Sequence, residues 1–270
     1  MCQRRLLAVF AHPDDEAFGV GGTLARYASE GVDVWLVTAS RGEAGGISDP
    51  TLATRANLPD VREDELRCAC RAYGIRPPTF LDYVDGQLTI AHQGQAVGKL
   101  VRLIRSIEPQ VVITFGPDGA YGLYDHIAVH RWTTIAVELA ADAGCFPDPE
   151  KTQCPTHHVA KLYYVALPEA QVKAMAEHGT AAVMMDGVPF PFVSRSPDEI
   201  TTVIDVSDYA TLKWQGIRCH ATQVAPDSPM LEDRNAAIAQ PWFTAESYVL
   251  AASKPGVGVG IERDLFAGLV

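Results

Sequence analysis

The chain of 270 residues has no apolar run close to the ~20 residues that a membrane-spanning helix needs. It also has no internal repeat, no catalytic serine motif and no phosphate-binding G-x-G-x-x-G after its first apolar segment. Basic residues are scarce, since 22 Lys and Arg stand against 33 Asp and Glu and give a net charge of −11. This charge argues against binding to nucleic acid or to an anionic membrane surface. We therefore expect a cytoplasmic protein that acts on a small molecule, and the sequence is compatible with a homo-oligomer.

The cysteines form no recognisable motif. There are six, none of them in a C-x-x-C pair: Cys2, Cys68, Cys70, Cys145, Cys154 and Cys219. A disulfide framework is typical of short secreted chains, whereas this chain is long and carries no clear secretion signal. We therefore expect free thiols, several of them buried.

The most informative stretch runs from Leu6 to Glu16. Six apolar residues, Leu6 to Ala11, lead into His12, Pro13, two aspartates and a glutamate. A short continuous apolar run is typical of a strand buried on both faces of a parallel sheet, and Pro13 ends the run. Ligands of open α/β sheets bind just outside the carboxyl ends of the strands, so this polar cluster is expected at the functional edge of the sheet.

The polar cluster suits a catalytic metal. A neutral imidazole and a carboxylate are ordinary zinc ligands, and a catalytic zinc takes three protein ligands plus a water. Asp14 and Asp15 are neighbours, so in near-extended backbone one side chain can bind the metal while the other faces the water. The alternative for either aspartate alone is a helix N-cap, with Glu16 favoured by the helix dipole. For the whole His-Pro-Asp-Asp-Glu cluster we favour the metal site.

A second polar cluster follows the apolar run at residues 110–115. Asp125, His126 and His130 lie at the start of a predicted helix, and residues four apart share a helix face. His126 can reach a metal held by the first cluster if the two strands are neighbours in the sheet. Each histidine alone could instead be a hydrogen-bonded helix residue, but together, after a strand end, they favour a metal site.

Apolar runs alternate with amphipathic helical segments along the first part of the chain. The strands predicted there cover residues 6–12, 33–38, 79–83, 110–115 and 161–166. The alternation predicts a doubly wound, mostly parallel, Rossmann-like α/β sheet of about five strands. We assign residues 1–180 to an α/β catalytic domain and residues 181–270 to a less regular C-terminal extension packed on the same domain. Within this extension, the Met- and Pro-rich residues 180–200 are predicted to be irregular.

The sequence A-H-P-D-D-E at residues 11–16 resembles the signature of the LmbE-like, or PIG-L, family of zinc-dependent N-acetylglucosaminyl deacetylases. The resemblance extends over most of residues 5–223. It implies a hydrolase that removes the acetyl group of an N-acetylglucosamine-type conjugate and releases acetate and a free amine, with Asp14 as the catalytic base. It also implies a Zn²⁺ cofactor, in a site that can hold Fe²⁺ as well, with three ligands: His12, Asp15 and His126.

Other segments resemble parts of the family that surround the substrate. The implied substrate-binding residues are Arg41, Glu43, Arg62, Asp85, Tyr121 and His220. Asp125 and His130 are implied as residues behind the ligands, where they orient the metal-binding side chains. Plain structural alternatives exist for most of these positions: a flexible glycine-rich loop, a solvated arginine, an ordinary Asp-Gly turn and a packed helix-end histidine.

One position departs from the family pattern. Leu123 stands where the family commonly has a histidine that stabilises the oxyanion of the reaction, and leucine cannot donate a hydrogen bond. A single donor of this kind is typically worth ~3 kcal/mol in the transition state. Tyr121, Tyr124, His130 or His220 could replace it. The alternative is a zinc-binding, sugar-binding protein with little turnover.

Two further alternatives stay open at this point. Within enzymes, the chain could be an amidase that acts on a thiol conjugate or on a glycosylated natural product. Outside this class, it could be a Rossmann-type nucleotide-binding protein, since glycines follow the first strand, although the G-x-G-x-x-G fingerprint is missing there.

Overall fold

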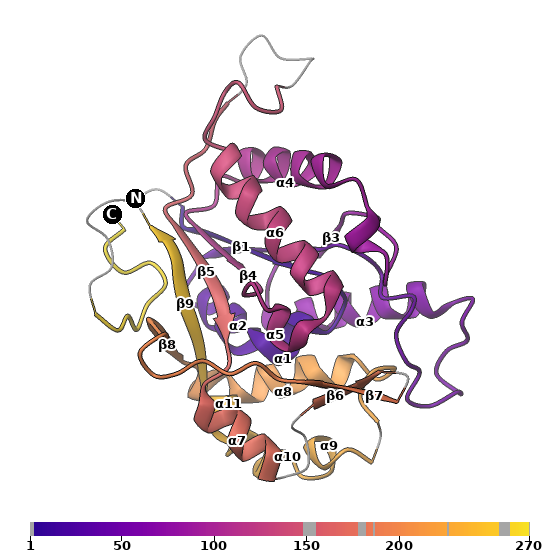
Figure 1. Cartoon of the computed structure of the whole chain (residues 1–270). Coiled ribbons are helices and arrows are strands. Elements are labelled where there is room, and N and C mark those ends of the chain that lie inside the picture. The colour runs from indigo at the N-terminus through magenta and orange to yellow at the C-terminus, as the bar shows by residue number, and fades with distance from the viewer. Residues whose placement is uncertain are drawn as a thin grey trace.

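A seven-stranded sheet runs through the computed structural model, in the order β3-β2-β1-β4-β5-β9-β8 (Figure 1). The structure describes residues 3–147, 155–177, 182–185, 187–225, 227–253 and 260–269. The strands of the sheet are β1 (Arg5–Phe10), β2 (Asp33–Thr38), β3 (Thr79–Phe80), β4 (Val111–Thr114), β5 (Lys161–Ala166), β8 (Thr202–Asp205) and β9 (Ala245–Ser253).

The five strands from the first part of the chain are parallel. Strand β1 pairs with β2 on one side and with β4 on the other, while β3 and β5 extend the sheet outward. The last two strands are antiparallel, since β9 pairs with β5 and β8 pairs with β9. The predicted doubly wound, mostly parallel sheet is therefore confirmed, and the C-terminal part of the chain adds two strands to the same sheet.

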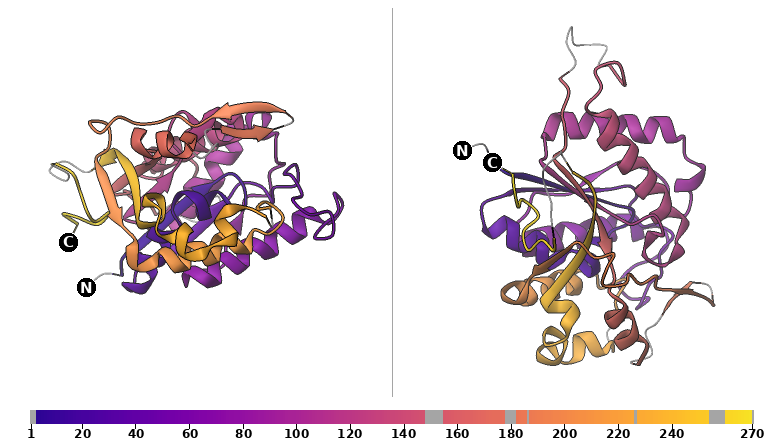
Figure 2. Two further views of the ribbon diagram at one scale, coloured as in Figure 1. Left: turned by 90° about the horizontal axis from the view of Figure 1, so that it is seen from below. Right: turned by 60° about the vertical axis from the view of Figure 1, so that its left-hand side comes forward.

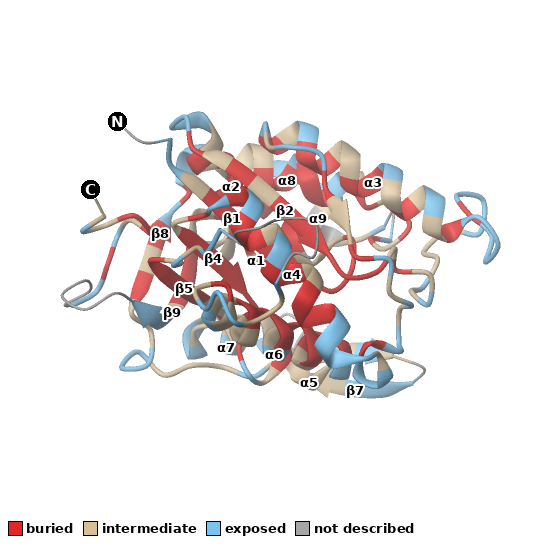
Figure 3. Cartoon of the chain, turned by 90° about the horizontal axis from the view of Figure 1, so that it is seen from above, coloured by how far each residue is buried: buried red, intermediate tan, exposed pale blue. Residues whose placement is uncertain are grey.

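Helices cover both faces of the sheet. Helices α4 (Gln93–Ile107) and α6 (Tyr124–Leu139) pack together on one face, and α2 (Gly21–Ser29), α3 (Leu58–Tyr73) and α8 (Ala210–Cys219) pack together on the other (Figure 1). The strands between these layers are buried, and the outer helix faces are exposed (Figure 3). The shorter helices are α1 (Asp15–Gly19), α5 (Gly119–Gly122), α7 (Glu169–Glu177), α9 (Pro229–Glu232), α10 (Arg234–Ile238), α11 (Pro241–Thr244), and the 3-10 turns η1 (Leu88–Ile90) and η2 (Ser207–Tyr209). Across the described residues, no helix is both long and apolar enough to cross a membrane.

A two-stranded hairpin lies outside the main sheet. Strands β6 (Ala182–Met185) and β7 (Val188–Pro191) pair in antiparallel fashion and lie at the periphery of the molecule in both views of Figure 2. The prediction that residues 180–200 are irregular is therefore wrong for these eight positions. Prolines suggested a loop, but they are compatible with a strand in an edge ribbon, where one side of the backbone needs no ladder hydrogen bond.

A disulfide joins two helices that are far apart in the sequence. Cys68 of α3 and Cys219 of α8 form it across a separation of 151 residues. The prediction of free thiols is therefore wrong for this pair, because helix packing brings together cysteines that share no motif. Cys70 and Cys145 are free, as predicted, while Cys2 and Cys154 lie outside the described residues.

A buried carboxylate connects the C-terminal strand β9 to helices α2 and α8. The Glu246 carboxylate on β9 accepts hydrogen bonds from the backbone N–H groups of Gly22, at 3.0 Å, and Thr23, at 2.7 Å, in the first turn of α2. The ammonium group of Lys213 on α8 lies 2.7 Å from the same carboxylate, and both side chains are almost fully buried. Glu246 therefore satisfies the free N–H groups of a helix start and neutralises a buried cation.

Close packing explains the glycines at the start of α2. A Cβ atom on Gly22 would lie 2.7 Å from the side chain of Val206, and one on Gly21 would lie 2.9 Å from the hydroxyl of Tyr73. These glycines serve close packing, and the N–H groups that a nucleotide phosphate would use in a Rossmann-type protein donate to Glu246. The local structure therefore argues against the nucleotide-binding alternative.

We expect Glu246→Ala to lower the free energy of unfolding by ~3–5 kcal/mol, because it leaves the buried Lys213 ammonium without its counter-ion. Guanidinium denaturation measures this loss. Glu108→Ala is the control, since Glu108 forms an exposed pair with Arg5 at 3.0 Å and is expected to cost only ~0–1 kcal/mol. Equal losses for the two variants would contradict the role given to Glu246.

Candidate metal centre

The two polar clusters meet at the carboxyl ends of β1 and β4. After β1 the chain winds outward to β2 and β3, and then returns to place β4 on the other side of β1. The β1–β4 junction is thus the point at which the winding direction reverses, where open α/β sheets form a crevice for ligands. His12 lies just beyond β1, and His126 lies in the first turn of α6, which follows β4.

Three side chains converge at this junction. Nε2 of His126 lies 3.1 Å from Oδ1 of Asp15, and Nδ1 of His12 lies 3.7 Å from Oδ2 of the same carboxylate. Candidate ligand atoms of the three residues all lie within 4.8 Å of one another, and the side chains are buried or nearly so. The backbone N–H groups of Ala11 and His12 donate to Asp15 and fix the direction of its carboxylate.

Hydrogen bonds on the far side of each imidazole fix which nitrogen is free. Nδ1 of His126 lies 3.1 Å from the carbonyl oxygen of Gly119, so it carries the proton and leaves Nε2 as a lone-pair donor. Nε2 of His126 is buried and makes no hydrogen bond within the described part of the chain. Nε2 of His12 lies 2.9 Å from Asp85 and 3.3 Å from Asp125, which leaves its Nδ1 free to face Asp15. Two imidazole lone pairs and a carboxylate that point at one another fit a metal cation.

The electrostatic field of the cluster favours positive charge. Burial lowers the pKa of His12, but hydrogen bonds to Asp125 and Asp85 outweigh burial and raise the pKa to about 10. Burial alone would raise the pKa of Asp15, but the neighbouring His126 and His12 lower this pKa to about 2. The carboxylates around the two imidazoles thus create a site in which a cation is stabilised.

His12 also belongs to a second group of possible metal ligands. His12, Asp85 and Asp125 also bring candidate ligand atoms within 4.8 Å of one another. Asp125, however, already accepts hydrogen bonds from the backbone N–H groups of Gly86, at 2.7 Å, and Leu88, at 3.1 Å. Its position behind His12 is that of a residue that orients a ligand.

Asp14 lies beside the three converging residues, in an unusual backbone conformation. Its φ is +114°, in a region that residues other than glycine rarely adopt. Its carboxylate lies 3.2 Å from the guanidinium of Arg62 and retains some exposure to solvent. Burial raises the pKa of Asp14 to about 6, and the attraction of Arg62 limits the rise.

The side chain of Arg62 extends from helix α3 to the residues around Asp14. It is buried and donates to the carbonyl oxygens of Pro13 and Gly42, the latter at 2.7 Å. Gly42 has a φ of +71°, and a Cβ atom there would lie 2.2 Å from the guanidinium. Glycine at position 42 therefore makes room for Arg62.

Asp85 and Glu43 form a carboxylate rim next to His12. Asp85 accepts a hydrogen bond from the backbone N–H of Ala44 at 3.0 Å, and its own N–H donates to Glu43 at 3.1 Å. The second carboxylate oxygen of Glu43 is buried and has no hydrogen-bond partner within the described residues. These two predicted substrate-binding residues thus lie next to the metal group and have acceptor oxygens that could face hydroxyl groups.

Tyr121 lies on the α5 turn, with its ring edge-on to His126 at a centroid distance of 5.0 Å. Gly119, Ala120 and Gly122 of this turn all have positive φ, so the backbone curls tightly around the base of the tyrosine. Burial raises the pKa of the Tyr121 phenol above its ordinary value, so the hydroxyl keeps its proton at neutral pH. Tyr121 is therefore a hydrogen-bond donor close to the metal group.

The other residues considered as replacements for the missing oxyanion donor at Leu123 are exposed to solvent or contact other groups. Tyr124 is 69% exposed, His130 bonds through Nδ1 to the carbonyl oxygen of Phe115 at 2.9 Å, and His220 is fully buried against Glu16. His130 therefore stands behind the site, since the Phe115 ring stacks on His126 at 4.0 Å.

The structure does not bring Arg41 into the cluster. Its guanidinium is partly exposed and pairs with Glu63 and Asp82, each at 2.7 Å. His220 does not face the crevice either. It has no exposed surface, and its ring contacts Glu16. These placements differ from the substrate-facing positions that the resemblance implied for both residues.

Glu16 was not among the predicted site residues, although it lies in the signature itself. Its buried carboxylate contacts both Asp14 and His220. The available signal was the third carboxylate of the cluster, which the helix-dipole interpretation had explained without a partner.

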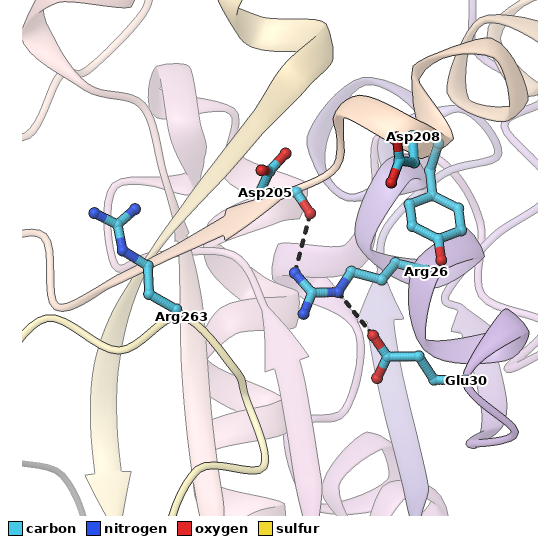
Figure 4. Close-up of a pocket in the computed structure, with 6 residues that line it drawn as sticks. Arg26, Glu30, Asp205, Asp208 and Arg263 are labelled. Carbon is cyan, nitrogen blue, oxygen red and sulfur yellow. Dashed lines mark hydrogen bonds and ion pairs between the residues drawn. The ribbon is translucent and has the colours of Figure 1, made fainter.

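A separate hollow on the surface offers no comparable chemistry. It has a volume of about 610 Å³ and is lined by Arg26, Glu30, Asp205, Asp208, Tyr209 and Arg263 (Figure 4). Arg26 bonds to Glu30 and to the carbonyl oxygen of Asp205, so its charge is already satisfied. None of the converging metal-ligand candidates lines this hollow, and the β1–β4 junction remains the candidate functional site.

Comparison with known proteins identifies the family of the chain. Residues 7–137 match the model of the PIG-L family, described as GlcNAc-PI de-N-acetylase. The chain is 39% identical to a 1D-myo-inositol 2-acetamido-2-deoxy-alpha-D-glucopyranoside deacetylase of Streptomyces griseus, over 98% of this chain and 89% of the relative. It is 37% identical to a protein of the same name from Mycobacteroides abscessus, over 100% of this chain and 99% of the relative.

Among solved structures, N,N'-diacetylchitobiose deacetylase from Pyrococcus horikoshii has a similar fold. The TM-score is 0.69 at 19% sequence identity, over 92% of this chain and 84% of that one. The sequence relatives and the family match, together with this shared fold, confirm the resemblance seen at residues 11–16. The chain therefore belongs to the PIG-L, or LmbE-like, family.

Proposed function

We propose that this protein is a metal-dependent N-deacetylase that acts on N-acetylglucosamine linked to 1D-myo-inositol and releases acetate and the free amine. The observation that carries the proposal is the convergence of His12, Asp15 and His126 beside a carboxylate, Asp14, that is not needed as a ligand. The choice of substrate follows the names of the relatives that align along almost the whole chain.

The residues that would hold the metal are His12, Asp15 and His126. Zinc suits two imidazoles and one carboxylate, and the same ligands can hold ferrous iron. When bound, zinc would supply Lewis-acid activation of a water and of the acetamide carbonyl. Asp125 and the carbonyl oxygen of Gly119 keep the two imidazoles in the tautomers that such binding needs.

Asp14 is the general base of the proposed reaction. It takes the proton of the attacking water and then returns a proton to the departing amine. Arg62 holds the Asp14 carboxylate at 3.2 Å and so orients it within the crevice. Asp85 and Glu43 accept hydrogen bonds from sugar hydroxyls at the rim.

Tyr121 replaces the donor that Leu123 cannot supply. The phenol is protonated at neutral pH and its ring lies against His126, which supports a role as donor to the carbonyl oxygen as negative charge develops there. This assignment favours a working enzyme over the non-catalytic sugar-binding alternative.

The partner in this proposal is a small amino-sugar conjugate. The cytoplasmic location and the homo-oligomer stay predictions from the sequence. A panel of substrates that includes a thiol conjugate and a glycosylated natural product separates the inositol conjugate from the amidase alternatives.

We expect Asp14→Asn to lower kcat for amine release by ~10²- to 10⁴-fold, because it removes the general base and leaves the metal ligands in place. Amine release from the inositol conjugate and zinc content are measured together. Asp64→Asn, on the exposed side of α3, is the matched control. Full activity of the Asp14 variant would rule out its role as the base.

We expect His126→Ala to lose zinc, because one of three protein ligands is removed. Elemental analysis of the purified variant and parent tests this, and His158→Ala, which changes an exposed histidine, is the control. Treatment of the parent with a chelator should abolish amine release, and added zinc should restore it. Unchanged zinc content in the His126 variant would show that the metal lies elsewhere.

A further inference from the structure

The backbone at Asp14 is held in a conformation that its sequence disfavours. A φ of +114° is strained for a residue with a Cβ atom, so surrounding contacts must maintain it. The carbonyl oxygen of Asp14 accepts from Ala17 at 2.9 Å, as the first turn of α1 requires. The N–H group of Asp14 points the other way, toward Glu16, and donates to Oε2 of its carboxylate at 3.1 Å.

The Glu16 carboxylate is almost fully buried, at 1% exposure, and therefore needs a second donor. His220 supplies it, since Nε2 of its fully buried ring lies 2.8 Å from Oε1 of Glu16. One carboxylate oxygen thus serves the backbone of Asp14, and the other accepts from a histidine 204 residues further along the chain.

Helix packing fixes His220 in turn. It lies at the C-terminal end of α8, directly after the cysteine that joins α8 to α3. Two residues later, Thr222 donates to Glu65 of α3 through both its N–H and its hydroxyl, each at 2.7 Å. The end of α8 is therefore anchored on the same helix that carries Arg62.

We propose that Glu16 and His220 are positioning residues that set the direction of the Asp14 carboxylate, and this inference rests on the proposed function of Asp14 as the base. The direction of the Asp14 side chain depends on the conformation of its backbone. The hydrogen bond from its N–H group to Glu16 holds this backbone, and the ion pair with Arg62 holds its carboxylate. Loss of His220 leaves Glu16 buried with an unsatisfied oxygen, and the carboxylate turns away from the Asp14 N–H. The Asp14 backbone then relaxes toward a negative φ, and its carboxylate moves away from the position in which it accepts the proton of the attacking water.

The test has two readouts on the zinc-loaded protein. NMR measures hydrogen exchange at the Asp14 amide, and steady-state kinetics measure kcat and KM for amine release from the inositol conjugate. The variants are His220→Ala, His220→Gln, which keeps an N–H donor, and Glu16→Leu, which removes the carboxylate. Ile217→Ala, a buried position on the same helix, controls for general loosening of α8.

We expect His220→Ala and Glu16→Leu to speed Asp14 amide exchange by at least ~10-fold and to lower kcat by about 10- to 100-fold. KM should stay within about threefold, and zinc content should not change, because neither residue touches substrate or metal. His220→Gln should recover most of both losses. Ile217→Ala should lower stability without moving either readout.

The inference is overturned if folded His220→Ala or Glu16→Leu keeps the parent's Asp14 exchange rate, or if Ile217→Ala has the same effect as either. It is also overturned if exchange quickens while kcat stays at the parent's value. Absence of amine release from the parent would refute the proposed function instead, and the exchange measurements would then decide the positioning of Asp14 by themselves. If His220→Ala does not fold, Glu16→Leu decides the inference by the same two readouts.

Discussion

The site depends on the fixed tautomers of two imidazoles that face one carboxylate. A backbone carbonyl at Gly119 and the carboxylates behind His12 take the ring N–H groups, and the free nitrogens then point at Asp15. The carboxylates around the two rings stabilise a cation at this point. Much of the surrounding structure, from the turn after β4 to the Asp-Gly segment beside His12, serves to hold these partners in place.

The two neighbouring aspartates are held by different contacts, which fits the different roles proposed for them. Backbone N–H groups hold the Asp15 carboxylate, whereas Asp14 is held at its side chain by Arg62 and at its backbone by Glu16. The sequence places these aspartates side by side, and in the structure their carboxylates take different directions through the unusual backbone at Asp14, where extended backbone was expected. The strain is therefore tied to the roles proposed for the two residues.

The sequence predicted the part of the site that follows from strand ends. Apolar runs identified β1 and β4 as buried parallel strands, and the polar residues after them were expected to meet if these strands were neighbours. The two strands do pair, and His12 and His126 lie close together. The contacts that helix packing creates were not predicted. The bond from His220 to Glu16 and the Cys68–Cys219 disulfide join segments more than 150 residues apart, and no local periodicity encodes such pairs.

The C-terminal third was also harder to predict, for a related reason. Strands β8 and β9 enter the sheet in antiparallel fashion, and the Glu246 carboxylate that secures β9 lies against the first turn of α2 at the other end of the chain. The ammonium group of its partner Lys213 lies on α8 and neutralises this buried carboxylate. In this protein the same types of charged residue are buried in the core and in the candidate site. Only the residues that they contact in the folded structure distinguish the two groups.

X-ray diffraction from zinc-loaded crystals, recorded on both sides of the zinc absorption edge, locates the metal directly. We expect one strong anomalous peak within coordination distance of His12, Asp15 and His126, ~2.0–2.2 Å from each ligand atom. A peak bound instead by His12, Asp85 and Asp125 would contradict this expectation, because Asp15 and His126 would then have no part in holding the metal.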